Sequence, residues 1–333
     1  MKVLVVSGGS GGHINPAISF IKEVKDIEFV YLGTNSKIEN KIISKLNIKY
    51  YLLNNKGLKK GLINKFKFIY YLIINIFKTY KIIKKEKVNK IITFGGYSSS
   101  SVFLANLLQK KEIYIHEQNA IIGRNNKLML KLCKKIFISF KNTKDIPIKY
   151  NNKIVFSGNP SFFKRKKKHN EFNILIVTGS LGASKVTNTL LPLLDMYENI
   201  KMISGINSEI KHDKIINYCE NMEELLSKVD LIITRAGATT INEISSLNIP
   251  SILIPSPNVI NNHQLINAVE YLKVKRGFLI EEKDLKIETI IELINEIKNN
   301  NFLYEELSKK AASFYNKNAI KIIKQEMNLW LNF

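Results

Sequence analysis

The sequence predicts an α/β protein of two domains, each built on a parallel sheet with helices on both faces. Three observations predict this fold class. Short apolar runs alternate with stretches of helical periodicity along the whole chain. Two of these runs, Val3–Val6 and Ile174–Val177, lead directly into glycine-rich loops. The length of 333 residues is typical of two domains rather than one.

The expected strands follow one another with room for a helix between most of them, which predicts parallel sheets covered by helices. Ligands of such sheets bind at the carboxyl ends of the strands, where the glycine loops lie. The expected strands are Val3–Val6, Phe29–Leu32, Ile91–Phe94, Ile113–Ile115, Ile136–Ser139, Ile154–Phe156, Ile174–Val177, Lys201–Ile203, Leu231–Ile233, Ile252–Ile254 and Phe278–Ile280.

A domain boundary is predicted near Gly158-Asn159-Pro160, because a proline and a basic run precede the next strand. The first domain would then cover residues 1–158 and the second residues 159–316. A last helix, over about 319–331, has no strand after it, so from periodicity alone it could pack on either domain.

The charge is strongly positive, with 51 Lys and Arg against 28 Asp and Glu and a net charge of +23. This balance favours an acidic partner such as nucleic acid, an anionic lipid or a phosphorylated substrate. Alternatively, the lysines form a solvated surface. The two cysteines, Cys133 and Cys219, have no metal-type spacing, which is typical of a reduced cytosolic protein. The first strand begins almost at Met1, so we expect no signal peptide.

Residues 56–90 form a separate feature, with eleven lysines and a single acid, Glu86. They enclose an apolar stretch over residues 68–77, which is well short of the ~20 residues that span a bilayer. A basic helix with aromatic and aliphatic residues is typical of a membrane-surface element. The alternative is a buried crossover helix with a lysine-rich outer face. The expected membrane contacts are Phe68, Tyr71, Leu72, Ile76, Phe77 and Lys78.

The first glycine loop reads Ser-Gly-Gly-Ser-Gly-Gly-His over residues 7–13. Glycines let the backbone approach a ligand closely, and the N–H groups of a helix start favour a phosphate. The second loop, Thr178–Ser184, repeats this arrangement. The pair predicts two nucleotide-type domains that face each other across a cleft.

Further polar clusters follow other strands. Gly95-Gly96-Tyr97-Ser98 opens a helix, and its serines could cap that helix or donate to a phosphate. His116-Glu117-Gln118-Asn119 is poor core material and is typical of a binding site, although it could also tie neighbouring backbone.

In the second half, a turn over residues 235–238 leads into a helix. Its small residues allow close approach of a diphosphate, and Glu243 could accept the hydroxyls of a ribose or simply favour the helix start. Gln264 and Asn267 lie three residues apart on one helix face, where two amides could bind sugar hydroxyls.

Taken together and in order, these motifs resemble the MurG family, the bacterial UDP-N-acetylglucosamine:lipid I N-acetylglucosaminyltransferases of peptidoglycan synthesis. The resemblance covers most of the chain. The motifs are Gly-Gly-Ser-Gly-Gly-His-x-x-Pro-Ala, Gly-Gly-Tyr-x-Ser, His-Glu-Gln-Asn-Ala-x-x-Gly, Gly-Asn-Pro, Gly-Ser-x-Gly-Ala, Arg-Ala-Gly-Ala-x-Thr-x-x-Glu and His-Gln-x-x-Asn-Ala.

The resemblance implies a GT-B fold, with two Rossmann-like domains and a C-terminal segment, 317–333, that crosses back to the first. It implies two substrates, UDP-N-acetylglucosamine and lipid I, and a peripheral location on an anionic membrane at the cytoplasmic face of the cell. For the acceptor diphosphate it implies Ser10, His13, Gly95, Gly96, Tyr97 and Ser98. For the donor it implies Ser10, Gly11, Gly12, His13, Asn119, Ser180, the backbone near Cys219, Ala238, Glu243, Gln264 and Asn267.

Two departures from the family pattern affect the donor phosphates. The family usually has an arginine where this chain has Phe162, so Lys164 or Arg165 would have to substitute. In the second glycine loop, Thr178 and Leu181 replace the usual Gly and Gln.

The implied reaction is an inverting transfer, in which the 4-hydroxyl of the muramoyl sugar attacks the donor's anomeric carbon and UDP leaves. His13 is the first candidate for the base, with binding of the acceptor diphosphate as its competing role, and Glu117 is the second candidate. No Asp-x-Asp metal signature is present, so we expect neither a metal nor another cofactor. Rival functions are another glycolipid glycosyltransferase and a UDP-N-acetylglucosamine epimerase. A nucleic-acid partner is not expected, because no recognised nucleic-acid motif is present.

Overall fold

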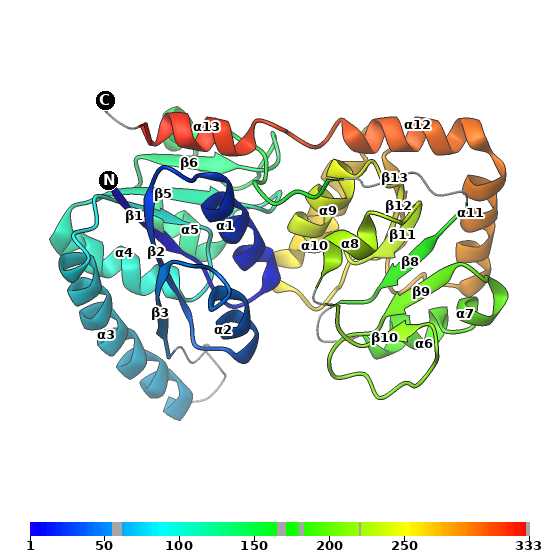
Figure 1. The fold of residues 1–333 in the computed structure, drawn as a ribbon, viewed down its shortest axis with the longest axis horizontal. Helices are drawn as coiled ribbons and strands as arrows, with labels where there is room; N and C mark the ends of the chain where they lie inside the picture. The colour runs from blue at the N-terminus through cyan, green and yellow to red at the C-terminus, as the bar shows by residue number, and fades with distance from the viewer. Residues whose placement is uncertain (55–61, 165–170, 180–182, 220, 331–333) are drawn as a thin grey trace. The chain divides into compact units, whose positions relative to one another are not determined.

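The computed structural model describes residues 1–54, 62–164, 171–179, 183–219 and 221–330. The chain forms two compact units (Figure 1). Unit 1 consists of Met1–Ser161 together with Lys317–Phe333, and unit 2 consists of Phe162–Asn316. The change from unit 1 to unit 2 thus lies three residues beyond the boundary expected from the sequence.

Unit 1 contains a seven-stranded sheet in the order β3-β2-β1-β4-β5-β6-β7, and every pair is parallel. Its strands are β1 (Lys2–Val6), β2 (Glu28–Thr34), β3 (Lys49–Leu53), β4 (Lys90–Thr93), β5 (Glu112–Glu117), β6 (Lys135–Ile138) and β7 (Ile154–Phe156). Its helices are α1 (Gly11–Glu23), α2 (Lys37–Ile43), α3 (Leu62–Lys85), α4 (Ser98–Gln109), α5 (Arg124–Met129), the 3₁₀ helix η1 (Ile148–Lys153) and α13 (Ala319–Glu326).

Helices cover both faces of this sheet (Figure 1). Helices α1, α2 and α13 pack on one face, and α3, α4 and α5 pack on the other. The helix α13 returns from the far end of the chain, and its Ile323 and the following Met327 are fully buried in the core of unit 1. The Lys90 ammonium also donates to the carbonyl of Met327 at 2.6 Å. These contacts confirm that the last helix crosses back to the first domain.

Unit 2 contains a six-stranded parallel sheet in the order β10-β9-β8-β11-β12-β13. Its strands are β8 (Ile174–Val177), β9 (Ile200–Ile203), β10 (Ile215–Ile216), β11 (Leu231–Thr234), β12 (Ser251–Leu253) and β13 (Gly277–Leu279). Its helices are α6 (Ser184–Leu190), α7 (Leu193–Met196), α8 (Met222–Leu226), α9 (Ala238–Ser246), η2 (Ile260–Asn262), α10 (His263–Leu272), α11 (Ile287–Asn299) and α12 (Asn301–Ala312).

All eleven strands expected from the sequence are present, and their ends differ by at most two residues. Two strands were not predicted, β3 and β10, and both lie at the edge of a sheet. The two-domain, parallel α/β prediction is therefore confirmed.

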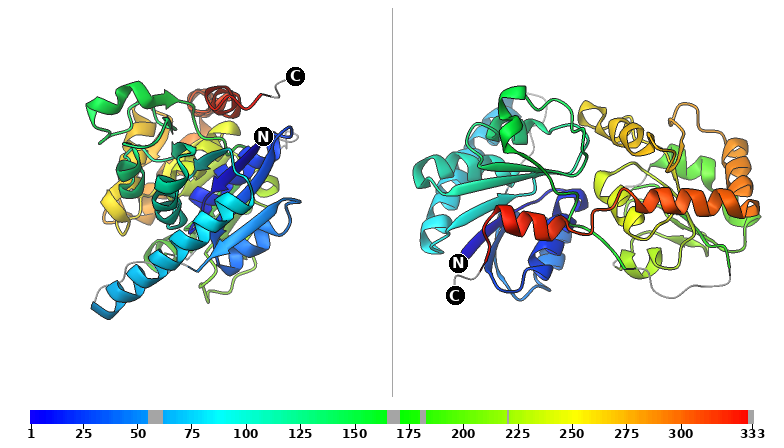
Figure 2. Two further views of the ribbon diagram at one scale, coloured as in Figure 1. Left: turned by 90° about the vertical axis from the view of Figure 1, so that its left-hand side faces the viewer. Right: turned by 90° about the horizontal axis from the view of Figure 1, so that it is seen from above.

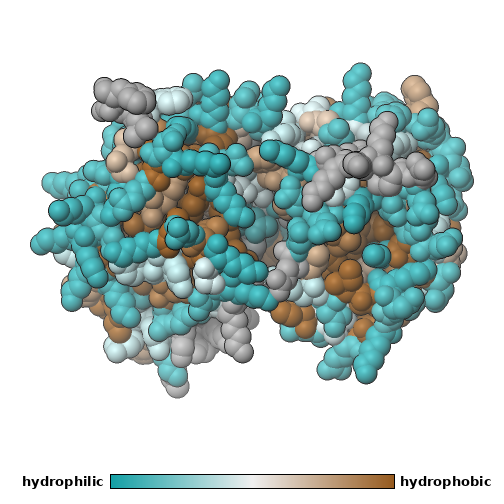
Figure 3. Space-filling model, in the orientation of Figure 1, coloured by the Kyte–Doolittle hydropathy of each residue, from teal (hydrophilic) through white to brown (hydrophobic). Residues whose placement is uncertain are grey.

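Most of the surface seen in Figure 3 is hydrophilic, as expected for a chain with this many lysines. Within the described ranges, none of the helices combines the length and apolar character needed to cross a membrane. The longest, α3, runs as a single 24-residue helix at the side of unit 1 (Figure 2).

Candidate active site

Each sheet has a pair of neighbouring strands at which the strand order reverses, and ligands of such sheets bind there. In unit 1 these strands are β1 and β4, and Val6 pairs with Thr93. In unit 2 they are β8 and β11, and Val177 pairs with Thr234. Because each pair ends in register, the glycine loops that follow lie at the same edge of their sheet.

The two glycine loops of unit 1 pack directly against each other. A Cβ on Gly96 would lie 2.1 Å from the carbonyl oxygen of Gly8, and Gly96 has a positive φ of 90°. Only glycine satisfies both conditions. The close approach joins the loop after β1 to the loop after β4 into one surface.

Helix α1 starts at this surface. Its N-cap, Ser10, is exposed, and its side chain makes no capping bond. Gly11 and Gly12 are exposed as well. Since the first amides of a helix lack intrahelical acceptors, this end offers N–H groups and a positive dipole to an anion.

The serines that open α4 are occupied within the fold. Ser98 is fully buried, with its Oγ 3.1 Å from Thr34 Oγ1. Ser99 is equally buried and bonds Thr93 at 2.5 Å. An anion here would therefore meet backbone amides and the half-exposed Tyr97 rather than these hydroxyls.

Beneath the first loop lies a buried carboxyl, Glu39. Its Oε1 accepts from Tyr31 Oη at 2.7 Å and from the Thr34 amide at 3.0 Å. Burial raises the pKa of Glu39 above its ordinary value, while the bonds from Tyr31, Thr34 and the Gly9 amide act in the opposite direction. Glu39 thus supports the loop at Gly9 and the end of β2.

His13 is half-buried in the first turn of α1. Its ring lies over Gly95, where a Cβ would be 3.0 Å from the ring atoms Cε1 and Nδ1. Its Nδ1 is 3.2 Å from Gln118 Oε1. A glycine at position 95 therefore makes room for the ring, and Gln118 holds it.

Glu117, the second base candidate, is 1% exposed and accepts four hydrogen bonds. Its Oε1 accepts from the backbone and side-chain nitrogens of Asn119 at 3.0 and 3.1 Å. Its Oε2 accepts from the Gly123 amide and from Asn126 Nδ2, both at 2.8 Å. This carboxylate organises the loop after β5, and Asn119 sits half-buried on that loop.

In unit 2, the loop after β8 contains Ser180, which lies outside the described residues. Thr178, which stands where the family usually has glycine, is buried. Its hydroxyl lies 3.3 Å from the carbonyls of both Ile203 and Ser204. The threonine therefore ties the end of β8 to the end of β9.

Arg235, at the end of β11, is also used for structure. Its Nε donates to the Thr178 carbonyl at 3.3 Å and its Nη1 to the Ile254 carbonyl at 3.1 Å. Its Nη2 pairs with Glu282 at 2.7 Å. The guanidinium joins three segments at the ligand-binding edge of the sheet.

Helix α9 begins directly after this turn. Its N-cap, Gly237, has no side chain to cap the helix, so backbone amides form this end. Ala238 and Glu243 are both 6% exposed. On α10, the Oε1 of the half-buried Gln264 accepts from the Ser256 amide at 2.9 Å. Asn267 is fully buried and donates to the Ala236 carbonyl at 3.2 Å, so it steadies the turn before α9.

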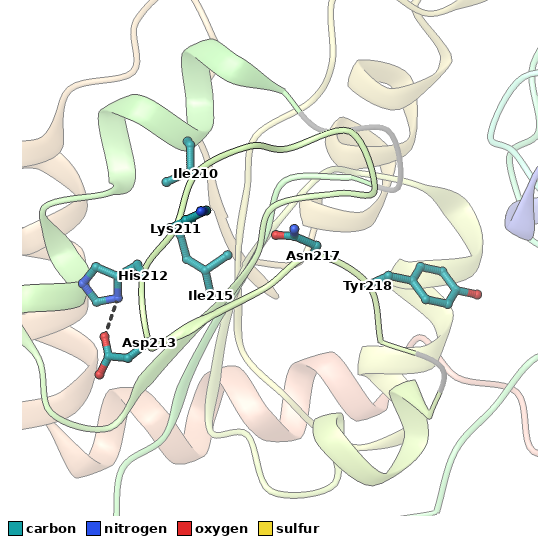
Figure 4. Close-up of a pocket in the computed structure, with 7 residues that line it drawn as sticks. All are labelled: Ile210, Lys211, His212, Asp213, Ile215, Asn217 and Tyr218. Atoms are coloured by element: carbon teal, nitrogen blue, oxygen red, sulfur yellow. Dashed lines mark ion pairs between the residues drawn. The ribbon is translucent and has the colours of Figure 1, made fainter.

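Next to the half-buried Cys219 lies an open hollow of about 760 Å³ (Figure 4). Figure 4 draws the pair of His212 and Asp213, 2.8 Å apart, and Tyr218 on opposite sides of it. The hollow is lined by Ile210, Lys211, His212, Asp213, Ile215, Asn217 and Tyr218. It is formed by the loop before β10 and the residues after it.

Phe162, which stands where the family usually has arginine, packs on Tyr315 with 5.9 Å between ring centroids. The neighbouring Lys164 is exposed, and Arg165 lies outside the described residues. The aromatic pair gives position 162 a packing function in this chain.

Helix α3 exposes an apolar stripe. Five side chains at helical spacing are between 49% and 72% exposed, namely Phe66, Ile69, Tyr70, Ile73 and Phe77. Exposed lysines accompany them at positions 67, 78, 81, 84 and 85. We call these ten residues the α3 face.

Of the membrane contacts expected from the sequence, Phe77 and Lys78 belong to the α3 face. The other four, Phe68, Tyr71, Leu72 and Ile76, are half-buried. Ile76 packs against the core of unit 1. The exposed apolar surface is thus rotated around the helix from the surface expected.

Comparison with known families fits this architecture. The glycosyltransferase family 28 N-terminal domain matches residues 3–138, and the glycosyltransferase family 28 C-terminal domain matches residues 152–325. The chain belongs to glycosyltransferase family 28.

Within this family, similar curated proteins carry the name UDP-N-acetylglucosamine--N-acetylmuramyl-(pentapeptide) pyrophosphoryl-undecaprenol N-acetylglucosamine transferase. The protein from Bacillus pumilus is 32% identical over 93% of this chain and 93% of its own length. That from Vesicomyosocius okutanii is 34% identical over 97% of this chain and 96% of its own length. These relatives confirm the family resemblance drawn from the ordered motifs.

Solved structures share the fold. MurG of Acinetobacter baumannii superposes with a TM-score of 0.75 at 24% identity, and the match covers 99% of both chains. A UDP-GlcNAc 2-epimerase from Neisseria meningitidis bound to UDP-GlcNAc gives a TM-score of 0.69 at 16% identity, over 99% of this chain and all of that one.

Three features of this structure were not predicted from the sequence. Glu39 lies in a short helix with no motif around it. Gln118 was part of a quoted motif, but no role was assigned to it. Of the ten residues of the α3 face, only Phe77 and Lys78 are among the membrane contacts expected from the sequence. The i, i+3, i+4 and i+7 apolar positions from Phe66 to Ile73 mark this stripe in the sequence, but the pattern alone does not say whether the stripe is buried or exposed.

Proposed function

We propose that this protein transfers N-acetylglucosamine from UDP-N-acetylglucosamine to the 4-hydroxyl of the muramoyl sugar of lipid I, which gives lipid II and UDP. The observation that carries the proposal is the agreement of the named relatives over more than nine-tenths of the chain at 32% and 34% identity. The two sheets, each with a glycine loop at its switch point, supply the matching architecture.

The donor would bind unit 2. Its diphosphate would meet the loop after β8, including Ser180, and the amide end of α9. Glu243, in the second turn of α9, would accept the ribose hydroxyls. Gln264 would offer its amide NH₂ to the sugar, because its Oε1 is already bonded to the Ser256 amide. Asn267 would act by holding the turn before α9, and the backbone near Cys219 would face the uracil.

The acceptor diphosphate would bind unit 1 at the joined glycine loops. Backbone amides at the starts of α1 and α4, with Ser10 and Tyr97, would surround it. The donor would also be contacted by Ser10, Gly11, Gly12 and Asn119. Helix ends of this kind stabilise a phosphate without a cation.

In the transfer, the acceptor O4 forms the new bond to the anomeric carbon while the bond from that carbon to the UDP oxygen breaks. The O4 proton passes to His13, which acts as the general base, a role typically worth ~10²–10⁴-fold in rate. Charge that develops on UDP is stabilised by the amides and dipole of α9, since fixed donors of this kind contribute ~3 kcal/mol each.

The α3 face would rest on the anionic cytoplasmic surface of the membrane that carries lipid I. Its apolar side chains would enter the interface, and each of its lysines would add about 1 kcal/mol of attraction to acidic lipid. This would place the enzyme peripherally at the membrane.

Activity is tested by incubation with UDP-N-acetylglucosamine and a soluble lipid I analogue. UDP release that requires the acceptor supports the transfer. Release or isomerisation of the sugar nucleotide without acceptor would instead indicate an epimerase. A His13→Ala enzyme should lose kcat, and a rise in KM for the acceptor at unchanged kcat would assign His13 to diphosphate binding.

Membrane contact is tested by flotation with vesicles of equal acidic and neutral lipid. Replacing both Ile69 and Ile73 with serine should weaken binding about 30-fold, since each half-exposed isoleucine contributes about 1 kcal/mol. Ile148→Ser is the matched control, because Ile148 is an isoleucine that is 84% exposed on a different element, η1. Equal loss in the control would refute the assignment.

A further inference from the structure

A chain of hydrogen-bonding contacts leads from the backbone of unit 1 to His13. The Gly158 carbonyl lies 3.0 Å from His116 Nε2. His116 Nδ1 lies 3.1 Å from Gln118 Nε2. Gln118 Oε1 lies 3.2 Å from His13 Nδ1. The orientation of each group along this chain can be worked out from chemistry.

The Gln118 amide has one permitted orientation. One of its terminal atoms lies 2.9 Å from the Phe94 carbonyl oxygen, which can only accept a hydrogen bond. That atom must therefore be the NH₂ group. The carbonyl Oε1 of Gln118 then faces His13, and it can only accept.

His116 supports the same orientation. The ring is fully buried, and burial lowers its pKa to about 4, so it is neutral near pH 7. Its Nε2 must carry the proton, because its neighbour is the Gly158 carbonyl. Its Nδ1 is therefore an acceptor, and the NH₂ group of Gln118 satisfies it.

We infer that Gln118 fixes His13 in the tautomer protonated on Nδ1, so that Nε2 presents the lone pair that takes the acceptor proton. The Nδ1 atom must donate, because Gln118 Oε1 accepts. Gln118 is thus a positioning residue for His13. The catalytic part of this inference rests on the proposed function, whereas the tautomer itself does not.

The chemistry of the partner explains why an amide suits this position. A carboxylate there would favour the cationic form of His13, which has no lone pair to accept a proton. A neutral amide orients the ring without charging it. The neutral His116 on the far side of Gln118 likewise places no charge in the chain of contacts.

The direct test is ¹⁵N NMR of protein labelled on its five histidines, with the His13 signals assigned by their loss in His13→Gln. The neutral ring of His13 should show a protonated Nδ1 and an unprotonated Nε2. In Gln118→Leu, this preference should be lost. In Gln118→Glu, the added negative charge should favour the form of the His13 ring that is protonated on both nitrogens. Gln325→Glu, an exposed site on α13, is the matched control and should leave His13 unchanged.

Kinetics supply the second readout. Gln118→Leu should lower kcat at least tenfold with a smaller change in acceptor KM, and Gln118→Glu should move the acid limb of the pH–kcat profile upward. A protonated Nε2 in the wild type, or an unchanged tautomer in Gln118→Leu, would overturn the inference even if transfer occurs. The predicted tautomer in a protein without acceptor-dependent UDP release would leave the inference standing and refute the proposed function.

Discussion

His116 makes the stability of unit 1 depend on pH. The ring is fully buried against Phe94, with 5.2 Å between ring centroids, and it donates to the Gly158 carbonyl. Protonation of Nδ1 would place two N–H donors, on His116 and on Gln118, against each other. We expect acid to destabilise unit 1 through this one side chain.

The magnitude follows from the pKa of His116, about 4 in the folded protein against an ordinary 6.5. Between these values the unfolded chain binds the proton and the folded chain does not. The stabilisation is therefore fully present above pH 6.5 and is lost as the pH falls toward 4. Between pH 7 and pH 5, titration of His116 should lower the free energy of unfolding by about 2 kcal/mol, and the largest loss at still lower pH is about 3 kcal/mol.

The assay compares wild type with His116→Gln in urea at pH 7 and pH 5. Glutamine can donate to the Gly158 carbonyl and accept from Gln118, but it does not titrate. The chain's one tryptophan, Trp330, lies in unit 1 beside Lys324 Nζ, 5.1 Å from the ring centroid. Its fluorescence therefore follows the unit that contains position 116.

Other titrating groups are common to both proteins, so their contributions to the pH dependence of stability cancel in the comparison. The wild type should lose about 2 kcal/mol more than His116→Gln between the two pH values. The variant's stability at pH 7 can differ through packing without affecting this test. Equal losses in the two proteins would refute the assignment of a buried, neutral His116.

Three further outcomes are expected. Burial raises the pKa of Glu39 in the folded protein, so the free energy of unfolding of the wild type should fall as the pH rises through that pKa. Urea unfolding of Glu39→Gln should show no such fall, because glutamine does not titrate. Gly96→Ala should lower the free energy of unfolding by about 2 kcal/mol or more in the same assay and raise the acceptor KM, because its Cβ would lie 2.1 Å from the Gly8 carbonyl oxygen. Gly11→Ala, with open space around its Cβ, should lower the free energy of unfolding less. Acceptor-dependent UDP release should continue in excess EDTA, and its complete loss would contradict catalysis by helix ends alone.

The fold could be predicted from the sequence because buried parallel strands are nearly continuous apolar runs. The strands that escaped prediction differ in this respect. The edge strand β3 begins with the exposed residues Lys49 and Tyr50, and β10 is only two residues long. Edge strands need less apolar character, so the pattern is weakest where they form.

The orientation of α3 could not be predicted from hydrophobicity, because the helix buries polar residues. Asn75 is 1% exposed and donates to the Asn54 carbonyl at 3.1 Å. Thr79 is fully buried and lies 3.4 Å from Ser101 Oγ. The buried side of the helix thus contains polar as well as apolar residues, and other apolar side chains face outward. Such pairings depend on the neighbouring helix and leave no periodic signal in the sequence.

In the candidate site, too, some features could be predicted from the sequence and others could not. Glycine loops after strands were predictable because strand, loop and helix are contiguous in the chain. The bond between His13 and Gln118 joins residues 105 positions apart and depends on how β1 and β5 are placed in the sheet. Likewise, the roles of Thr178 and Arg235 emerge only when the ends of β8, β9 and β12 are brought together.

The location of the positive charge separates two functions that the net charge alone does not distinguish, namely phosphate binding and attraction to the membrane. Residues 7–17 and 95–101, which form the glycine loops and the starts of α1 and α4, contain no lysine or arginine, and Arg235, at the turn before α9, is paired with Glu282. The α3 face, in contrast, carries five exposed lysines. Phosphate binding would thus rely on backbone amides, whereas attraction to the membrane would rely on lysines. At 0.1 M salt, the attraction between exposed charges more than about 10 Å apart is largely screened. Rising salt should therefore release the protein from acidic vesicles well before it raises the KM for the sugar nucleotide. Parallel changes in the two quantities would contradict donor binding by backbone amides without lysines.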